Sequence, residues 1–332
     1  MAKNRVLIIY NTCGLSIEPD EQHWITEIEL ILGQSLPDIH LVHSDCGTSA
    51  EKRSVVKEHF GTKISYYHTP ESLPVQHTCN HAIKSVIKEK GRFEFYCYVG
   101  AGISMWNKHH LAYAYKLMKE ESDIGKCDFH VVRHPSMEQQ LEEMHPPSNF
   151  YHFLERNPKE KYFILRPGQR VNNHCSMFSD DFCKAYDDRI LPDCFAGNGA
   201  EGVYTFLTTC IGKRHAVMSY KYCPSVYHLP DLDGANQFLL KKGEKRTYFY
   251  DWVYNKSVNL DELNIKGSKW GFTTDTPENE YCSLQIPRQE FDEHGLPKTK
   301  EQQDNLYELI SKNIFICKRY LDYDNIEHEF IP

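Results

Sequence analysis

Polar residues that could bind a ligand recur where short apolar runs of the sequence end. Asn11 and Thr12 follow the run at residues 6–9, and Asp45 opens the segment Asp-Cys-Gly-Thr-Ser after a second run. Asn80 comes after a third run, in the stretch Asn-His-Ala-Ile-Lys. Carboxylates accept hydrogen bonds and amides both donate and accept them, so these side chains can recognise the polar edge of a ligand. Each motif alone is weak, because Asp-x-Gly-Thr is a common turn and Asn80 could cap a helix.

Glycines mark a further candidate contact. Gly100, Ala101 and Gly102 follow a fourth apolar run, and their backbone N–H groups would let a sugar or phosphate approach closely; a plain tight turn is the alternative. After the first run, the sequence holds neither the GxGxxG nor the P-loop pattern, so dinucleotide and P-loop phosphate sites are unsupported there. The literal GxGxxG at residues 197–202 follows no convincing strand, and we interpret it as a turn that feeds a helix.

The elements that must position these residues alternate along the first half of the chain. Apolar runs predict strands, and helical periodicity predicts the helices between them. The predicted strands are 5–11, 38–45, 63–68, 93–99 and 128–134, and the predicted helices are 21–32, 50–60, 76–89 and 108–122. This alternation predicts an α/β fold, with a mostly parallel sheet flanked by helices on both faces. Such sheets bind ligands beyond the carboxyl ends of their strands.

The second half of the chain is less regular. It holds predicted strands at 162–165, 215–219 and 225–227, and a predicted helix at 203–212. From residue 234 the composition shifts to lysines, aromatic residues and short loops, with one terminal amphipathic helix at 301–320. We therefore expect a domain at 1–233 and a partly helical C-terminal extension at 234–332 that packs on it.

The order and spacing of these motifs resemble those of GT-A-fold glycosyltransferases, particularly the family 2-like group, over residues 4–230. In that family an Asn-bearing turn ends one strand, Asp-x-Gly-Ser/Thr ends a second, and an Asn-x-Ala/Gly-Ile segment follows the third. The resemblance implies a GT-A-like, Rossmann-like sheet. It also implies that Asp45 accepts a hydrogen bond from the nucleobase imide, that Asn11 and Thr12 lie near it, and that Asn80 lies near the ribose and diphosphate.

The family's next landmark is absent. It is an Asp-x-Asp motif that holds a divalent metal against the leaving diphosphate. Its place is taken by Gly100, Ala101 and Gly102, which the resemblance makes the floor of the donor site. Three explanations stay open: a metal-independent enzyme whose leaving group is stabilised by Lys, Arg or His, metal ligands from elsewhere, or lost catalysis. A Mn²⁺ or Mg²⁺ cofactor is therefore unsupported at the expected place, although His228, after a predicted late strand, is a candidate metal or diphosphate contact.

Glu201 is the candidate catalytic residue. It stands at the start of the predicted helix 203–212, where the macrodipole favours the charged form of a carboxylate. By the resemblance, inverting enzymes carry an acid there that faces the acceptor and serves as general base. Only the Glu of the family's Glu/Asp-Asp pair is present, and helix capping is the alternative role. The implied function is transfer of a sugar from a nucleoside-diphosphate donor to a saccharide or other hydroxyl acceptor, and the alternative is a non-catalytic nucleotide- or glycan-binding module.

Two further groups could serve this site. Trp106 is a candidate stacking platform for a sugar, with ordinary packing as the alternative. Lys108, His109 and His110 could neutralise phosphate in place of a metal. We expect His109 to face solvent and leave His110 open.

Composition limits the partners and the compartment. The 332 residues carry 38 Lys and Arg against 46 Asp and Glu, and a net charge of −8 gives no global attraction to nucleic acid or anionic lipid. None of the 12 cysteines shows zinc-site spacing, so we expect mostly buried, reduced thiols and a cytoplasmic location. The first apolar run is too short for a signal peptide, and no apolar window reaches the length of a membrane span. The expected partners are a nucleoside-diphosphate sugar and a hydroxyl acceptor.

Overall fold

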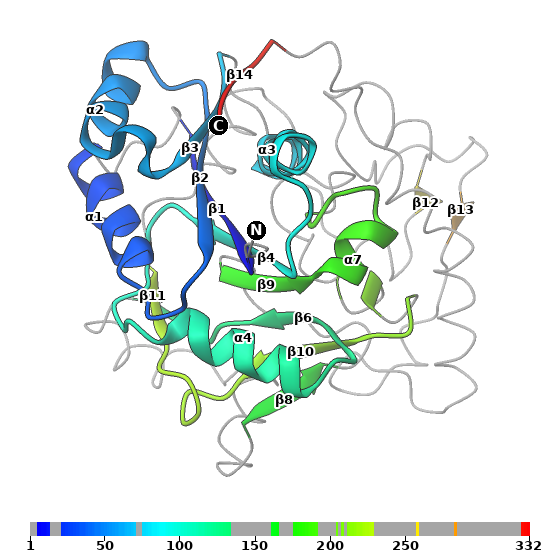
Figure 1. The fold of residues 1–332 in the computed structure, drawn as a ribbon. Coiled ribbons are helices and arrows are strands. Elements are labelled where there is room, and N and C mark those ends of the chain that lie inside the picture. Colours follow the sequence, from blue (N-terminus) through cyan, green and yellow to red (C-terminus); the bar gives the residue numbers. More distant parts are fainter. Residues whose placement is uncertain are drawn as a thin grey trace.

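A nine-stranded, mostly parallel sheet forms the centre of the protein (Figure 1). The computed structural model describes residues 5–13, 21–70, 75–133, 161–165, 175–191, 204, 207–208, 211–228, 257–258, 282–283 and 327–332. The strands of the sheet are β1 (Val6–Cys13), β2 (Ile39–Cys46), β3 (Ser65–Thr69), β4 (Phe95–Gly100), β6 (Ile124–Asp128), β8 (Tyr162–Leu165), β9 (Cys175–Ser179), β10 (Arg214–Met218) and β14 (Glu329–Ile331). They lie in the order β14-β3-β2-β1-β4-β9-β6-β10-β8, and β8, β9 and β14 run antiparallel to their neighbours. The predicted mostly parallel α/β sheet is confirmed.

Helices cover both faces of this sheet. The helices are α1 (Glu21–Leu32), α2 (Ala50–Phe60), α3 (Val75–Lys90), α4 (His110–Glu120) and α7 (Asp180–Ala185), with a short 3₁₀ turn η1 (Gly61–Lys63). Helices α1 and α2 lie on one face of β1 to β3, and α3 lies on the other (Figure 1). The predicted helices in the first half are therefore confirmed to within two residues at each end.

Two small sheets accompany the large one. One joins β5 (Ile103–Ser104), β11 (Val226–His228) and β7 (Val131–Arg133), and the other joins β12 (Ser257–Val258) and β13 (Cys282–Ser283). The predicted fifth strand, 128–134, is wrong in part. Its end forms β7 of a small sheet, whereas the main-sheet strand is β6, which the sequence hides because it contains Gly125, Lys126 and Asp128.

A buried ion cluster explains why such a polar strand lies in the core. We call Lys126, Asp128, Ser176 and His215 the Asp128 cluster; all four side chains are at most 1% exposed. The ammonium of Lys126 donates to Asp128, and it also lies 4.3 Å from the centre of the Tyr204 ring. Because each charge has a partner, β6 can carry a lysine through the middle of the sheet.

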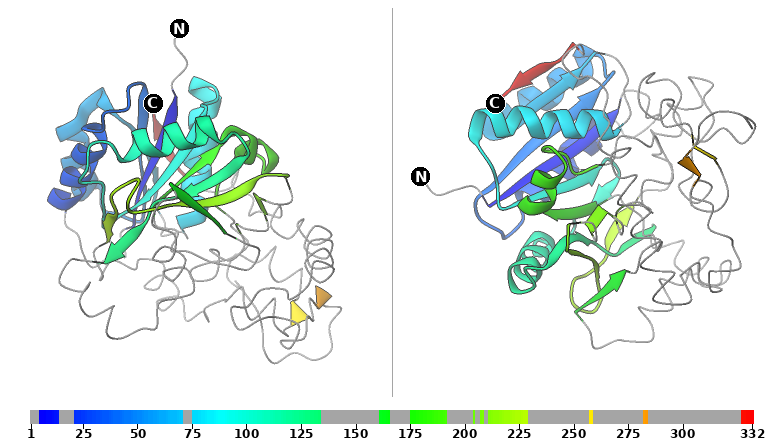
Figure 2. Two further views of the ribbon diagram at one scale, coloured as in Figure 1. Left: turned by 90° about the horizontal axis from the view of Figure 1, so that it is seen from below. Right: turned by 90° about the vertical axis from the view of Figure 1, so that its right-hand side faces the viewer.

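The C-terminal end of the chain returns to the main sheet. Strand β14 pairs antiparallel with β3, with Glu329 opposite His68, and Figure 2 shows it in red beside the blue strands. The last residues therefore join the sheet of the N-terminal half. The remainder of the predicted extension, including its helix at 301–320, lies outside the described residues apart from β12 and β13.

Two further expectations concern the whole chain. In the described ranges no helix is long and apolar enough to cross a bilayer. The cysteines whose side chains are described are buried thiols, as expected. They are Cys46, Cys79, Cys97, Cys127, Cys175, Cys183 and Cys223.

Candidate functional site

Three parallel strands bring polar residues to one edge of the sheet. In the register of β1, β2 and β3, Thr12 lies opposite Asp45, and Asp45 lies opposite His68. Partners in register share a face of the sheet, so the three side chains form one row at the carboxyl ends of their strands. The predicted neighbourhood of Asp45 and Thr12 is therefore present in the fold.

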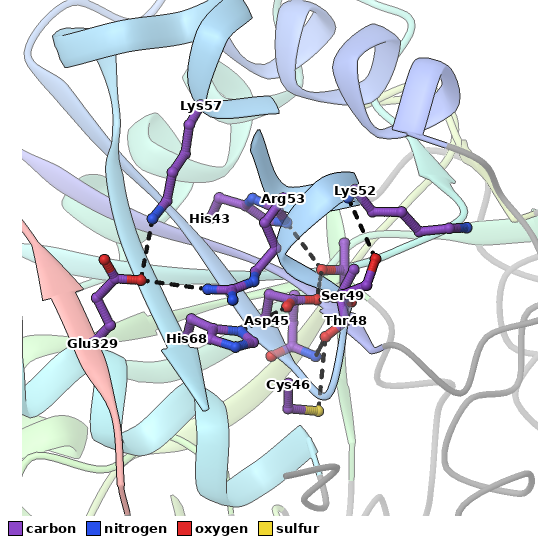
Figure 3. Close-up of polar contacts among 12 residues, drawn as sticks. His43, Asp45, Cys46, Thr48, Ser49, Lys52, Arg53, Lys57, His68 and Glu329 are labelled. Carbon is purple, nitrogen blue, oxygen red and sulfur yellow. Dashed lines mark hydrogen bonds and ion pairs between the residues drawn. The ribbon is translucent and has the colours of Figure 1, made fainter. Parts of the chain in front are cut away.

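The carboxylate of Asp45 is the centre of a hydrogen-bond network (Figure 3). Its Oδ1 accepts hydrogen bonds from the hydroxyls of Thr12 and Thr48, both at 2.6 Å, and its Oδ2 accepts one from His68 Nδ1 at 2.9 Å. The hydroxyl of Thr12 accepts in turn from His43 Nε2 at 2.9 Å. We call these five residues the Asp45 cluster.

Burial and hydrogen bonding oppose each other at this carboxylate. Burial raises the pKa of Asp45, but the hydrogen bonds from His68, Thr12 and Thr48 outweigh it and hold that pKa below its usual value. Burial lowers the pKa of His43 to about 4, so His43 is neutral and its Nε2–H donates to Thr12. The cluster is therefore an ionised acceptor held by the neutral hydroxyls of Thr12 and Thr48 and by His68.

One acceptor position of Asp45 is left over. A carboxylate has about four lone-pair positions. Thr12, Thr48 and His68 fill three of them in the described part of the chain. The fourth, on Oδ2, can accept an N–H group from a ligand.

Basic residues of α2 lie next to the Asp45 cluster. Ser49 caps this helix by accepting a hydrogen bond from the Lys52 amide at 3.4 Å, which fixes where the helix starts. From its second turn Arg53 and Lys57 reach Glu329 of β14, at 3.3 and 3.1 Å. Figure 3 shows Arg53 reaching between Glu329 and the Asp45 cluster. The edge thus offers a cation as well as the carboxylate.

Asn11 connects this network with the 100–102 turn. It pairs in register with Gly100, and its backbone oxygen accepts the Ala101 N–H at 2.9 Å. Its side chain is 5% exposed, and its Oδ1 has no hydrogen-bond partner among the residues that the structure describes. A buried acceptor without a partner among the described residues has a hydrogen-bonding position that a ligand or a water can fill.

The amides of the turn itself are already used. Ala101 donates to Asn11, and the N–H of Gly102 donates to Glu27 Oε2 at 3.1 Å. Gly102 adopts φ of 85°, a conformation that glycine tolerates best. The N–H groups of Ala101 and Gly102 are therefore engaged within the protein, and the close approach of a sugar or phosphate to this turn stays a prediction that rests on its surface.

Asn80 has a role in the fold. It is fully buried in α3, its amide nitrogen donates to the Leu191 carbonyl at 2.7 Å, and its oxygen accepts the N–H groups of Ile190 and Leu191 at 3.1 Å. Both polar atoms are engaged with the main chain. The predicted contact with ribose or diphosphate does not fit this geometry, and we leave Asn80 out of the proposed site.

The small sheet brings the main chain of His228 next to the 100–102 turn. In the register of β11 and β5, His228 lies opposite Ile103, the residue that follows Gly102. Only the main chain of His228 is described. Glu201 lies outside the described residues, so its predicted role stays a prediction. Across the described ranges no three His, Cys, Asp or Glu side chains are placed to hold a metal ion, and we derive no step through one.

Trp106 and the residues after it lie elsewhere. The Trp106 indole donates to the Ser225 carbonyl at 2.8 Å and stacks on Tyr227. Gln34, which follows α1, donates to the main chain on both sides of Trp106, toward the amino end of β2. Trp106 therefore lies against Tyr227 of β11 with 45% of its surface exposed, and its role as a stacking platform for a sugar stays a prediction.

The basic residues predicted to follow the fourth strand differ among themselves. Lys108 and His109 are exposed, and His109 bonds to Ser35, as expected of surface residues. His110 is fully buried, and burial lowers its pKa to about 4. A neutral buried imidazole at His110 supplies no cation in place of a metal, whereas phosphate contacts by Lys108 and His109 stay predictions.

Four site residues were not anticipated from the sequence: Glu27, His43, Thr48 and His68. Two of them carried a visible signal. His43 stands two positions before Asp45 in a strand and therefore shares its face. Glu27 interrupts the apolar stripe of α1 between Trp24 and Ile28. Thr48 belongs to the Asp-Cys-Gly-Thr-Ser segment and bonds to Asp45 three positions earlier, whereas the place of His68 follows only from the strand register.

Comparison with known proteins adds similarity at the level of solved structures only. No family model matches the sequence, and no curated protein matches it. The mannosyltransferase PcManGT from Pyrobaculum calidifontis, solved with GDP-Man and Mn²⁺, aligns at a TM-score of 0.48 and 15% identity, covering 69% of this chain and 57% of that one. Two structures of S. aureus TarS align at 0.48 and 0.49, both at 15% identity, covering 68% and 72% of this chain and 60% and 38% of theirs. The chain thus spans at most 60% of these proteins, and we rest its function on the site residues and sequence motifs.

Proposed function

We propose that the chain is a glycosyltransferase that moves a sugar from a nucleoside-diphosphate donor to a hydroxyl of a saccharide or another acceptor. The observation that carries the proposal is the Asp45 carboxylate. It is buried at the carboxyl edge of the sheet and held by three donors, and among the residues that the structure describes none fills its fourth acceptor position. Parallel sheets of this kind bind ligands at that edge. The motif order around Asp45 resembles the nucleotide half of GT-A enzymes.

The chemistry of Asp45 limits which nucleobases the sugar donor can carry. A carboxylate accepts an N–H and repels a lone pair at the same position. Uracil and guanine present an imide-type ring N–H, whereas adenine and cytosine present a bare ring nitrogen there. We therefore expect uridine or guanosine diphosphate sugars as donors. Asn11, through its unpaired Oδ1, is the proposed contact for the adjoining part of the nucleoside.

The transfer step is proposed as a single inverting displacement. The acceptor oxygen forms a bond to the anomeric carbon while the bond from that carbon to the diphosphate oxygen breaks. Glu201 takes the acceptor's proton, and the nucleoside diphosphate leaves with the bonding electron pair. Two groups are candidates to stabilise the negative charge of the leaving group. They are Arg53, near the proposed nucleobase contact Asp45, and His228, near the 100–102 turn.

Binding and turnover test the two halves of the proposal separately. Asp45→Asn replaces an acceptor by a donor at the free position, so the affinity for UDP or GDP in calorimetry should fall tenfold to a hundredfold. Asp38→Asn is the matched control, because Asp38 precedes the other end of β2 and its side chain is 44% exposed. Equal nucleotide affinities in the two variants would contradict the role of Asp45.

A second candidate function rests on the replacement of Asp-x-Asp by Gly-Ala-Gly: a non-catalytic nucleotide- or glycan-binding module. The variant Glu201→Gln distinguishes this binding module from a transferase. A transferase should lose transfer or donor hydrolysis in this variant while nucleotide affinity stays within twofold. Nucleotide binding without turnover in the unmodified protein, with Mn²⁺ and with EDTA, would favour the binding module.

A further inference from the structure

Glu27 is a buried carboxylate inside the apolar face of α1. Its neighbours on that face, Trp24, Ile28 and Ile31, are buried, and Glu27 itself is 1% exposed. A carboxylate is taken out of water at a high cost unless hydrogen bonds replace its hydration. An apolar residue would complete this part of the core more favourably. The acid at this position therefore indicates a role other than packing.

Three donors from three different places surround this carboxylate. Its Oε2 accepts the hydroxyl of Tyr10 at 2.5 Å and the backbone N–H of Gly102 at 3.1 Å. Its Oε1 pairs with Nε2 of His23, one turn earlier in α1, at 2.9 Å. Burial, and then the charge of Glu27, raises the pKa of Tyr10, which keeps its hydroxyl a donor. Glu27 thus joins helix α1, strand β1 and the 100–102 turn.

The turn depends on this acceptor. Gly102 is buried and at positive φ, so its N–H points inward, and without Glu27 a buried donor would be left unpaired. Ala101 is tied to Asn11 on the other side. The turn lies between Gly100, next to Asn11 on β1, and Ile103, opposite His228 on β11. It therefore stands between the nucleoside side of the proposed site and the late strand.

We propose that Glu27 is a positioning residue of the donor site: by accepting the Gly102 N–H, it holds the 100–102 turn at the position where the diphosphate and sugar of the donor pass over it. This inference rests on the proposed function for the identity of the ligand. The turn carries no polar side chain of its own, so its position is fixed from the core beneath it. Glu27 acts through Gly102 and does not touch the donor.

Glu27→Gln tests the role with nearly unchanged shape. The amide can no longer accept from Tyr10, Gly102 and His23 together, so we expect hydrogen exchange of the Ala101 and Gly102 amides to accelerate at least tenfold. Affinity for the UDP- or GDP-sugar should fall at least tenfold, whereas affinity for the free nucleoside, whose proposed contacts are Asp45 and Asn11 and not the turn, should stay within twofold. Glu29→Gln is the matched control on the same helix, since its side chain is 56% exposed, and should change none of these.

Gly102→Ala provides a second route if Glu27→Gln folds poorly. A side chain at φ of 85° strains the turn while the Glu27 carboxylate is retained, and should reproduce the loss of nucleotide-sugar affinity. Unchanged exchange of the turn amides in Glu27→Gln would overturn the role of Glu27, whatever ligand binds. An equal loss of nucleoside and nucleotide-sugar affinity would also overturn it, because it would show general damage. If the unmodified protein binds no nucleotide sugar, the proposed function fails. The exchange measurement would still report on the hydrogen bond between Glu27 and Gly102.

Discussion

Two carboxylates end parallel strands of the same sheet, and their surroundings differ. Asp45 ends β2 and is held by two threonine hydroxyls and the ring of His68. Asp128 ends β6 and is held by the ammonium of Lys126, the hydroxyl of Ser176 at 2.5 Å and His215 at 2.5 Å. Both carboxyls have a lowered pKa; burial raises the pKa of Asp128, but Lys126 and His215 bring it to about 2.

The difference separates a site from a structural element. In the Asp128 cluster the charge of the carboxylate is met by a buried cation within the same strand, and burial lowers the pKa of His215 to about 4, so that cluster is electrically complete. In the Asp45 cluster the hydroxyls contribute no charge, and no other described residue fills the fourth acceptor position. A carboxylate whose charge is neutralised by a buried ammonium has little to offer a ligand. Asp45 has no ammonium or guanidinium among its described hydrogen-bond partners, so it can still attract a donor from a ligand.

The first prediction breaks the complete cluster. Asp128→Asn leaves the Lys126 ammonium buried without its counter-charge, and the free energy of unfolding should fall by about 3–5 kcal/mol. Urea denaturation at pH 7 measures it. The double variant Lys126→Met with Asp128→Leu removes both charges and should recover most of the loss, since buried pairs are often replaceable by apolar residues. A loss below about 1 kcal/mol in the single variant would show that the cluster is not a compensated ion pair.

The second prediction is that acid destabilises the protein through one buried histidine in each cluster. Burial lowers the pKa of both His43 and His215 to about 4. The unfolded chain binds a proton on each below about pH 6.5, while the folded protein stays neutral there down to about pH 4, so stability falls as the pH drops through this window. Each histidine should account for about 2 kcal/mol of the loss at pH 5.

Single variants measure that contribution. His43→Gln and His215→Gln should each flatten the dependence of the unfolding free energy on pH between 4 and 6.5, relative to the unmodified protein. His59→Gln is the control, because its side chain is 43% exposed. A flatter curve for only one of the two variants would show that the two histidines do not contribute equally to the loss of stability in acid.

The sequence predicted the fold of the N-terminal half well because its signals there are local. Apolar runs and helical periodicity fix β1 to β4 and α1 to α4 without knowledge of their partners. Strand β6 was missed because Lys126 looks exposed until its counter-charge is placed beside it. Asp45 was found through a local motif, whereas His68 and Glu27 were missed because their roles depend on strand register and on a turn about 75 residues away.

The last prediction applies the same substitution to the open cluster. Asp45→Asn leaves no buried ammonium without its counter-charge, and the hydroxyls of Thr12 and Thr48 can rotate toward the new amide. The free energy of unfolding should therefore fall by only about 1–2 kcal/mol, less than in Asp128→Asn, when both are measured in urea at pH 7. Addition of the nucleotide that binds the unmodified protein should raise its stability and leave Asp45→Asn nearly unchanged. Equal losses in the two variants would mean that Asp45 is as structural as Asp128, and would remove the observation on which the proposed function rests.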